Sequence, residues 1–137
     1  MTTEDLTDPG KPNLHVSLGE DNMIHLVLGG NASEDYLEEV LAWAEKVKNA
    51  MRTAKANSKN GKVLTLIDIS TLDQFDQKSM AILQDLMSFN KDYATKTATF
   101  GGNLFSIMAQ ETVMLMTHRT NMKAFKKREE ALAWLKE

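Results

Sequence analysis

The side chains best suited to chemistry or binding lie close together in one stretch of the chain. They are carboxylates, hydroxyls, one amine and one aromatic ring: Asp68, Ser70, Asp73, Phe75, Asp76, Lys78 and Ser79. Paired carboxylates such as Asp73 and Asp76 can share acid–base work only beside a suitable base or nucleophile. The stretch has no histidine, and Lys78 is its one candidate base. Because the chain also lacks a Gly-x-Ser-x-Gly elbow and a His-Glu-x-x-His pair, we expect no catalytic residue and predict a surface that binds a ligand or partner.

A short apolar run begins just before these residues and must position them. Its members are Val63, Leu64, Leu66, Ile67 and Ile69. Apolar residues on both faces predict a strand that is covered on both sides, as in a mixed or parallel sheet, although a buried helical turn gives a similar run. Asp68 and Ser70 then stand at the carboxyl end of the strand, where ligands and partners gather in open α/β sheets.

A helical pattern follows the polar stretch, and Asp76 is a good N-cap for it. The pattern continues to about residue 93 in two neighbouring apolar stripes, one of Met80, Leu83 and Met87 and the other of Ile82, Leu86, Phe89 and Tyr93. The sequence therefore predicts a strand, a tight loop over Asp73-Gln74-Phe75 and a helix. The alternative to a binding surface is that these residues only build the core.

This part of the chain resembles the STAS domain, the module of anti-sigma factor antagonists and of the cytoplasmic tails of sulfate transporters. In that family a hydrophobic strand ends in Asp-Leu-Ser, and Asp-Ser-Ser-Gly-Leu opens a helix several residues later. Asp68-Ile69-Ser70 falls on the first motif, and Asp76-Gln77-Lys78-Ser79-Met80 falls on the second. A closing helix of the form Glu-Glu-Ala-Leu-x-Trp-Leu, frequent in STAS-like and SpoIIAA-like proteins, occurs at residues 129–135. The resemblance spans roughly residues 13–136.

The resemblance implies a regulatory protein-interaction module with one departure. Lys78 falls where the antagonists carry the serine that a partner kinase phosphorylates, and Ser79 falls on the glycine. Since a lysine amine cannot serve as that serine, we expect the module to lack the usual phosphorylation switch. Ser79 could be a displaced acceptor, but a serine in the first turn of a helix is more often a helix-start residue.

The start of the chain predicts a β-hairpin after a disordered lead-in at residues 1–12. Two alternating apolar sets share a face only if Leu18 pairs with Ile24, Val16 with Leu26 and Leu14 with Leu28. The loop then places Asn22, which tolerates positive φ, between the strands. His15 and His25 share the other face without a third ligand, so we expect no metal site.

The rest of the chain completes an α/β domain of STAS type over residues 13–137, with a mixed sheet of about five strands and four helices. We expect helices at about 33–56, 76–93, 104–117 and 129–135, and further strands at 97–100 and 122–125. Ser33 or Asn31 should cap the first helix. Its apolar face is Leu37, Val40, Leu41, Ala44, Val47 and Met51, widened by Tyr36 and Trp43.

Two further segments are candidate binding features. Gly101-Gly102-Asn103 predicts a strand-to-helix turn, and backbone N–H groups there, with Asn103, could bind an anion. The helix that follows carries Met108, Met114 and Met116 among apolar residues on nearly every side. Three interpretations of this helix remain open: it is well buried in the core, it forms a dimer face, or it is the wall of a small apolar pocket.

Composition narrows the class of protein. The 137 residues have a formal net charge of −3, which argues against a general nucleic-acid role, and no cysteine, which suits a cytoplasmic protein. No apolar run approaches the roughly 20 residues of a membrane span. We expect no cofactor. The first hypothesis is a non-catalytic interaction module that binds a protein partner or a second copy, the second is a carrier or sensor of a small apolar or anionic ligand, and an enzyme comes third.

Overall fold

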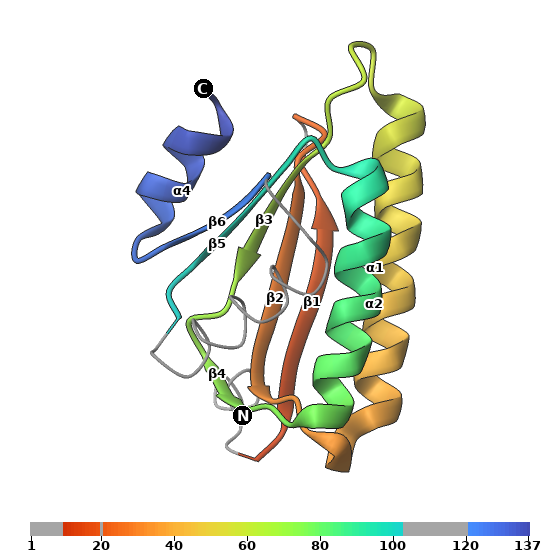
Figure 1. Cartoon of the computed structure of the whole chain (residues 1–137), viewed down its shortest axis with the longest axis vertical. Coiled ribbons are helices and arrows are strands. Elements are labelled where there is room, and N and C mark those ends of the chain that lie inside the picture. The colour runs from red at the N-terminus through yellow and green to blue at the C-terminus, as the bar shows by residue number, and fades with distance from the viewer. Residues whose placement is uncertain (1–9, 20, 103–120) are drawn as a thin grey trace, which may run out of the picture.

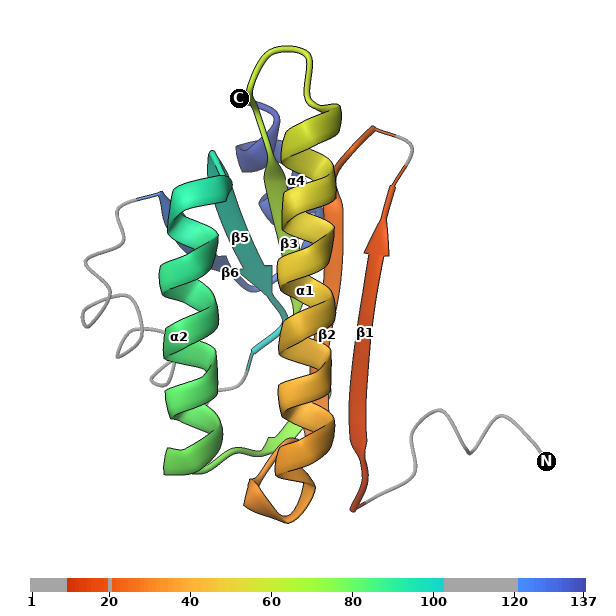
Figure 2. The same ribbon diagram turned by 90° about the vertical axis from the view of Figure 1, so that its right-hand side faces the viewer.

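The structure is a computed structural model that describes residues 10–19, 21–102 and 121–137. Its elements in chain order are β1 (Pro12–Leu18), β2 (Ile24–Asn31), the short 3-10 helix η2 (Glu34–Tyr36), α1 (Leu37–Asn57), β3 (Leu64–Asp68), β4 (Leu72–Gln74), α2 (Gln77–Tyr93), β5 (Lys96–Phe100), β6 (Met122–Phe125) and α4 (Arg128–Leu135). The strands form one sheet in the order β1-β2-β3-β5-β6, and β4 pairs with β2. Among the strands that the structure describes, β1 alone is antiparallel to its neighbour. Helices α1 and α2 cover one face of the sheet and α4 lies on the other (Figures 1 and 2).

The hairpin forms in the predicted register. Leu18 pairs with Ile24, Val16 with Leu26 and Leu14 with Leu28. Asn22 has a φ of 66°, and its side-chain Nδ2 donates to the carbonyl oxygen of Ala54 at 2.8 Å. The prediction that Asn22 takes the positive-φ position is confirmed, and its side chain also fixes the turn to the last part of α1.

The predicted central strand is β3, which lies between β2 and β5 and runs parallel to both. Ile67, 3 % exposed, packs into the core under α1 and α2, whereas Leu66, 2 % exposed, packs into the core under α4. The two-sided burial of this strand is the reason for its nearly continuous apolar sequence.

In the predicted apolar face of α1, Val40, Ala44, Val47 and Met51 are buried, and so is Trp43, which was expected to widen the face. Leu41 is 48 % exposed and Leu37 is partly exposed, while Ala54 is buried although it was not predicted. Each residue turns the helix by about 100°, so Leu41 lies well outside the stripe that Val40, Ala44, Val47 and Met51 present to the sheet. The aromatic ring of Trp43 is held at the edge of that stripe, where its indole N–H donates to the carbonyl oxygen of His15 at 2.9 Å.

Two further details differ from the prediction. The stretch expected as a loop at Asp73-Gln74-Phe75 is partly a strand, because Leu72 is buried and Ala32 N donates to Gln74 O at 2.9 Å. The sheet therefore has six strands rather than five. The predicted helix at residues 104–117, with Met108, Met114 and Met116, lies outside the described residues.

A buried polar cluster lies between α2 and the sheet, and the apolar stripes did not predict it. Asn90 is fully buried, and its Oδ1 accepts from Thr97 Oγ1 at 2.8 Å. Its Nδ2 lies 3.5 Å from both Thr65 Oγ1 and Met51 Sδ. Because an amide in a dry core needs such partners, this cluster fixes how α2 sits on β3 and β5.

Within the described residues, no helix combines the length and the apolar character that a membrane crossing requires.

Candidate functional site

The carboxyl end of β3 holds the first group of predicted site residues. Asp68 is half-buried, and its Oδ1 accepts from both the backbone N (2.8 Å) and the Oγ (2.6 Å) of Ser70. Gly101 follows β5 and lies against Ser70 with a φ of +82°, so that a Cβ added to Gly101 would lie 2.7 Å from Ser70 Cβ. The fold therefore brings Asp68, Ser70 and Gly101 together, although they come from separate parts of the chain.

The carboxylate of Asp76 holds two helix starts at once. Its Oδ1 accepts from Ser79 N at 3.1 Å, which confirms Asp76 as the N-cap of α2. Its Oδ2 accepts from Glu34 N, in the 3-10 turn that leads into α1, at 2.7 Å. The N–H groups of a first helical turn have no partner within the helix, and a carboxylate suits their positive end. One side chain thus satisfies the starts of two neighbouring helices.

These contacts also set the ionisation of Asp76. The hydrogen bond from the Glu34 backbone lowers the pKa of Asp76 most strongly, burial opposes it, and the bond from Ser79 lowers the pKa further. All the stabilising bonds are made to the charged form. Asp76 is therefore an anion over the whole ordinary pH range, and both of its carboxylate oxygens accept hydrogen bonds from backbone N–H groups.

Ser33 and Asn31 do not cap the first helix as predicted. Ser33 precedes η2 without a capping hydrogen bond from its side chain, and Asn31 Oδ1 accepts instead from Ser33 N at 3.1 Å. The capping oxygen comes from Asp76, 42 positions further along the chain. Sequence reasoning based on neighbouring residues cannot find such a cap.

Lys78 forms a second link between the same two helix starts. Its Nζ lies 2.9 Å from Glu34 Oε2, and both side chains are largely exposed. The hydrogen bond and the charge of Glu34 raise the pKa of the Lys78 amine. An exposed pair of this kind contributes little to stability, but it places a cation where the family resemblance expects a serine.

Ser79 lies beneath this surface. The residue is 0 % exposed, and its Oγ has no hydrogen-bond partner. The only hydroxyl in the motif is therefore inside the protein, whereas the flanking Gln77 and Lys78 side chains are exposed.

An open hollow of about 420 Å³ lies beside Asp76. Its lining residues come from the entry to α1 and from β4 and the residues after it: Ser33, Glu34, Asp35, Asp73, Gln74, Phe75 and Asp76. Of the predicted site residues, Asp73, Phe75 and Asp76 line it, whereas Asp68, Ser70, Lys78 and Ser79 do not. The sequence analysis missed Ser33, Glu34 and Asp35 as site residues. In the sequence, these three residues were marked only by their position at the predicted start of a helix.

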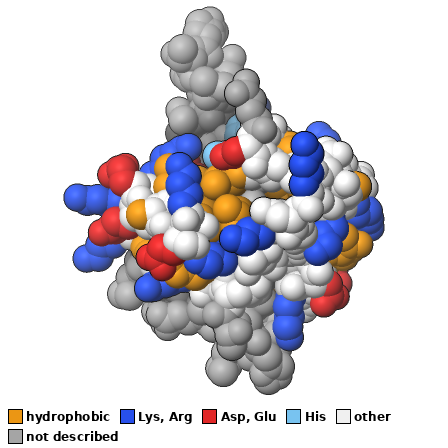
Figure 3. Space-filling model, turned by 90° about the horizontal axis from the view of Figure 1, so that it is seen from above, with side chains coloured by type: hydrophobic (Ala, Val, Ile, Leu, Met, Phe, Trp, Pro, Cys, Tyr) orange, Lys and Arg blue, Asp and Glu red, His pale blue; other side chains and the backbone are white. Residues whose placement is uncertain are grey.

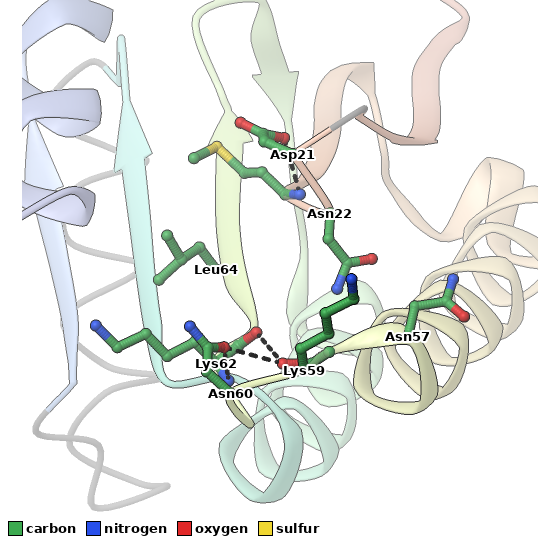
Figure 4. A pocket seen from close by; sticks show the side chains of 9 residues that line it. Asp21, Asn22, Asn57, Lys59, Asn60, Lys62 and Leu64 are labelled. Atoms are coloured by element: carbon green, nitrogen blue, oxygen red, sulfur yellow. Dashed lines mark hydrogen bonds between the residues drawn. The ribbon is translucent and has the colours of Figure 1, made fainter.

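A second hollow, of about 480 Å³, lies at the opposite end of the sheet. Asn22, Lys59 and Lys62 are among its lining residues, and Leu64 at the start of β3 faces it (Figure 4). Seen from above, this end shows hydrophobic side chains with Lys and Arg side chains around them (Figure 3). It contains none of the predicted site residues.

The structure describes only part of the remaining predicted features. Gly101 and Gly102 are described, whereas Asn103 lies outside the described residues, so the anion site at this turn stays a prediction. Among the residues that the structure describes, no group of three or more His, Cys, Asp or Glu side chains could hold a metal ion.

Comparison with known proteins agrees with this architecture. The family model described as SpoIIAA-like matches residues 23–136. An uncharacterised protein from Shewanella loihica PV-4 with a SpoIIAA-like fold superposes with a TM-score of 0.60 at 19 % identity, covering 89 % of this chain and 91 % of that one. The anti-sigma factor antagonist SpoIIAA in its unphosphorylated form also gives 0.60, at 13 % identity, with 90 % and 97 % covered.

A putative anti-sigma factor antagonist from Thermotoga maritima gives a TM-score of 0.54 at 12 % identity, covering 90 % of this chain and 95 % of that one. A search among curated proteins found no match. The structural neighbours share the fold, while the family model matches most of the sequence itself. The chain therefore belongs to the SpoIIAA-like family.

Proposed function

We propose that this chain is a non-catalytic protein-interaction module of a cytoplasmic regulatory system, and that it binds its partner without a phosphorylation switch. The observation that carries the proposal is the start of α2. Lys78, which the motif resemblance puts at the position of the antagonists' phosphorylated serine, is an exposed ammonium 2.9 Å from Glu34, and Ser79 is fully buried.

The geometry of this edge supports binding rather than catalysis. Asp76 is occupied by two backbone N–H groups and the Lys78 amine by a carboxylate. Asp35 and Asp73 are free carboxylates, but the one hydroxyl in the lining, on Ser33, has no hydrogen-bond partner that could act as its base. The same contacts hold β4 and two helix starts in a fixed relation, which suits a surface that a partner recognises without rearrangement.

Phosphate mapping tests the absence of the switch. Mass spectrometry of the protein purified from its own cells should find no phosphate on Ser79, because a kinase cannot reach a hydroxyl that is 0 % exposed. The variant Lys78→Ser, incubated with an antagonist-type serine kinase, provides a control in which the acceptor position is exposed. Phosphate on Ser79 in cells would overturn this part of the proposal.

In-cell photo-crosslinking tests the binding surface. A photoreactive amino acid at position 73 or 75, in the lining of the hollow beside Asp76, should link the chain to one defined protein. The same group at position 41 serves as the control, because Leu41 is exposed on the outer side of α1. Equal products from positions 41, 73 and 75, or none from 73 and 75, would contradict a partner at this edge.

A further inference from the structure

We propose that the hollow beside Asp76 receives an arginine side chain of the partner. This inference rests on the proposed function, because it names the chemistry of the partner that binds this edge.

Two carboxylates at the hollow are free to bind. Asp35 and Asp73 are exposed and line the hollow. Within the described part of the chain, neither carboxylate has a hydrogen-bond or ion-pair partner, whereas Glu34 is paired with Lys78 and Asp76 with two backbone donors. The positive ends of the two helices are thus already neutralised by Asp76, and a cation entering the hollow meets two unpaired negative charges.

An unpartnered hydroxyl in the wall of the hollow also points to an occupant. Ser33 is 8 % exposed, and its Oγ is buried without any hydrogen-bond partner. Buried polar groups without a partner are uncommon in folded proteins. The Oγ is covered in this structure, so a donor bound in the hollow would supply the missing bond once the Ser33 side chain rotates toward it.

The aromatic ring of Phe75 favours arginine over lysine. The ring is half-buried and lines the same hollow as Asp35 and Asp73. A planar guanidinium can stack on an aromatic face and donate two parallel hydrogen bonds to a carboxylate. A lysine ammonium is more strongly hydrated and lacks the planar fork, so it matches this set less well.

Titration with short peptides, followed by amide NMR shifts, tests the recognition directly. The probes are Ac-Gly-Arg-Gly-amide, the matching lysine peptide, and the matching citrulline peptide, which keeps the shape of arginine without its charge. We expect the arginine peptide to shift the amides of residues 33–35 and 73–76 with a weak, saturable affinity. The lysine peptide should bind more weakly by about threefold or more, and the citrulline peptide should leave these amides unshifted.

A pair of matched variants localises the effect. Asp73→Asn removes one free carboxylate, and we expect it to weaken binding of the arginine peptide by about three- to fivefold. Asp92→Asn, an equal change of charge on an exposed residue at the other end of α2, should leave the affinity unchanged. Equal shifts from the citrulline peptide, equal affinity for lysine, or equal loss in both variants would each overturn the inference.

The outcomes separate this inference from the proposed function. If crosslinks at positions 73 and 75 capture a partner but the arginine peptide leaves the hollow unshifted, the function stands and the arginine inference fails. If the peptide binds but no partner is crosslinked, the hollow recognises guanidinium and the proposed function fails.

Discussion

Replacing Ile67 with alanine should lower the free energy of unfolding by about 2–5 kcal/mol. Ile67 is 3 % exposed, lies on the central strand β3 and packs against the core that α1 and α2 cover. Removing most of its side chain forfeits its burial and leaves a cavity, because strands on both sides keep the backbone in place. Urea unfolding followed by circular dichroism measures the loss.

Leu41→Ala is the matched control for this change. It removes a similar side chain from a site that is 48 % exposed, so the free energy of unfolding should change by no more than about 0.5 kcal/mol. A loss below about 1 kcal/mol for Ile67→Ala would mean that β3 is not the centre of the core.

Replacing Asp76 with alanine should lower the free energy of unfolding by about 1–4 kcal/mol, since a lost helix cap costs about 0.5–2 kcal/mol and Asp76 caps two helix starts. Ser79 N and Glu34 N would both lose their acceptor. Asp73→Ala is the control, because Asp73 is an exposed carboxylate nearby that makes no capping bond. Equal losses in the two variants would show that the double cap is not formed.

The contribution of Asp76 should also depend on pH in one direction. Its pKa is lowered by folding, so its stabilising effect is fully present above the unfolded pKa near 3.8 and is lost as the pH falls through the folded value. The difference in unfolding free energy between the wild type and Asp76→Ala should therefore shrink as the solution is acidified below about pH 4. A difference that stays constant into strong acid would contradict the charged cap.

Local patterns in the sequence predicted most of the fold. The alternation of apolar residues determined the hairpin register, and a run apolar on both faces identified β3, because burial leaves a direct mark on residue type. The N-cap at Asp76 was predictable because a cap and the helix that it begins are neighbours in the chain. The error at Leu41 arose because an apolar residue also occurs on the helix outside the buried stripe.

The candidate site was less predictable, because it depends on contacts between distant parts of the chain. Nothing near Glu34 in the sequence indicates that its N–H would meet Asp76 or that its carboxylate would pair with Lys78. The buried state of Ser79 and Asn90 was equally hidden, since both are polar residues in an amphipathic helix. Such features follow from how two helices approach each other on the sheet.

The pairing of Lys78 with Glu34 has a consequence for any attempt to engineer a phosphate at position 78. In a Lys78→Ser variant, the Glu34 carboxylate would lose its cationic partner. A phosphate on the new serine would add negative charge on the same side of the two helix starts, and like charges repel. An engineered switch at position 78 would therefore need a neutral residue at position 34 as well.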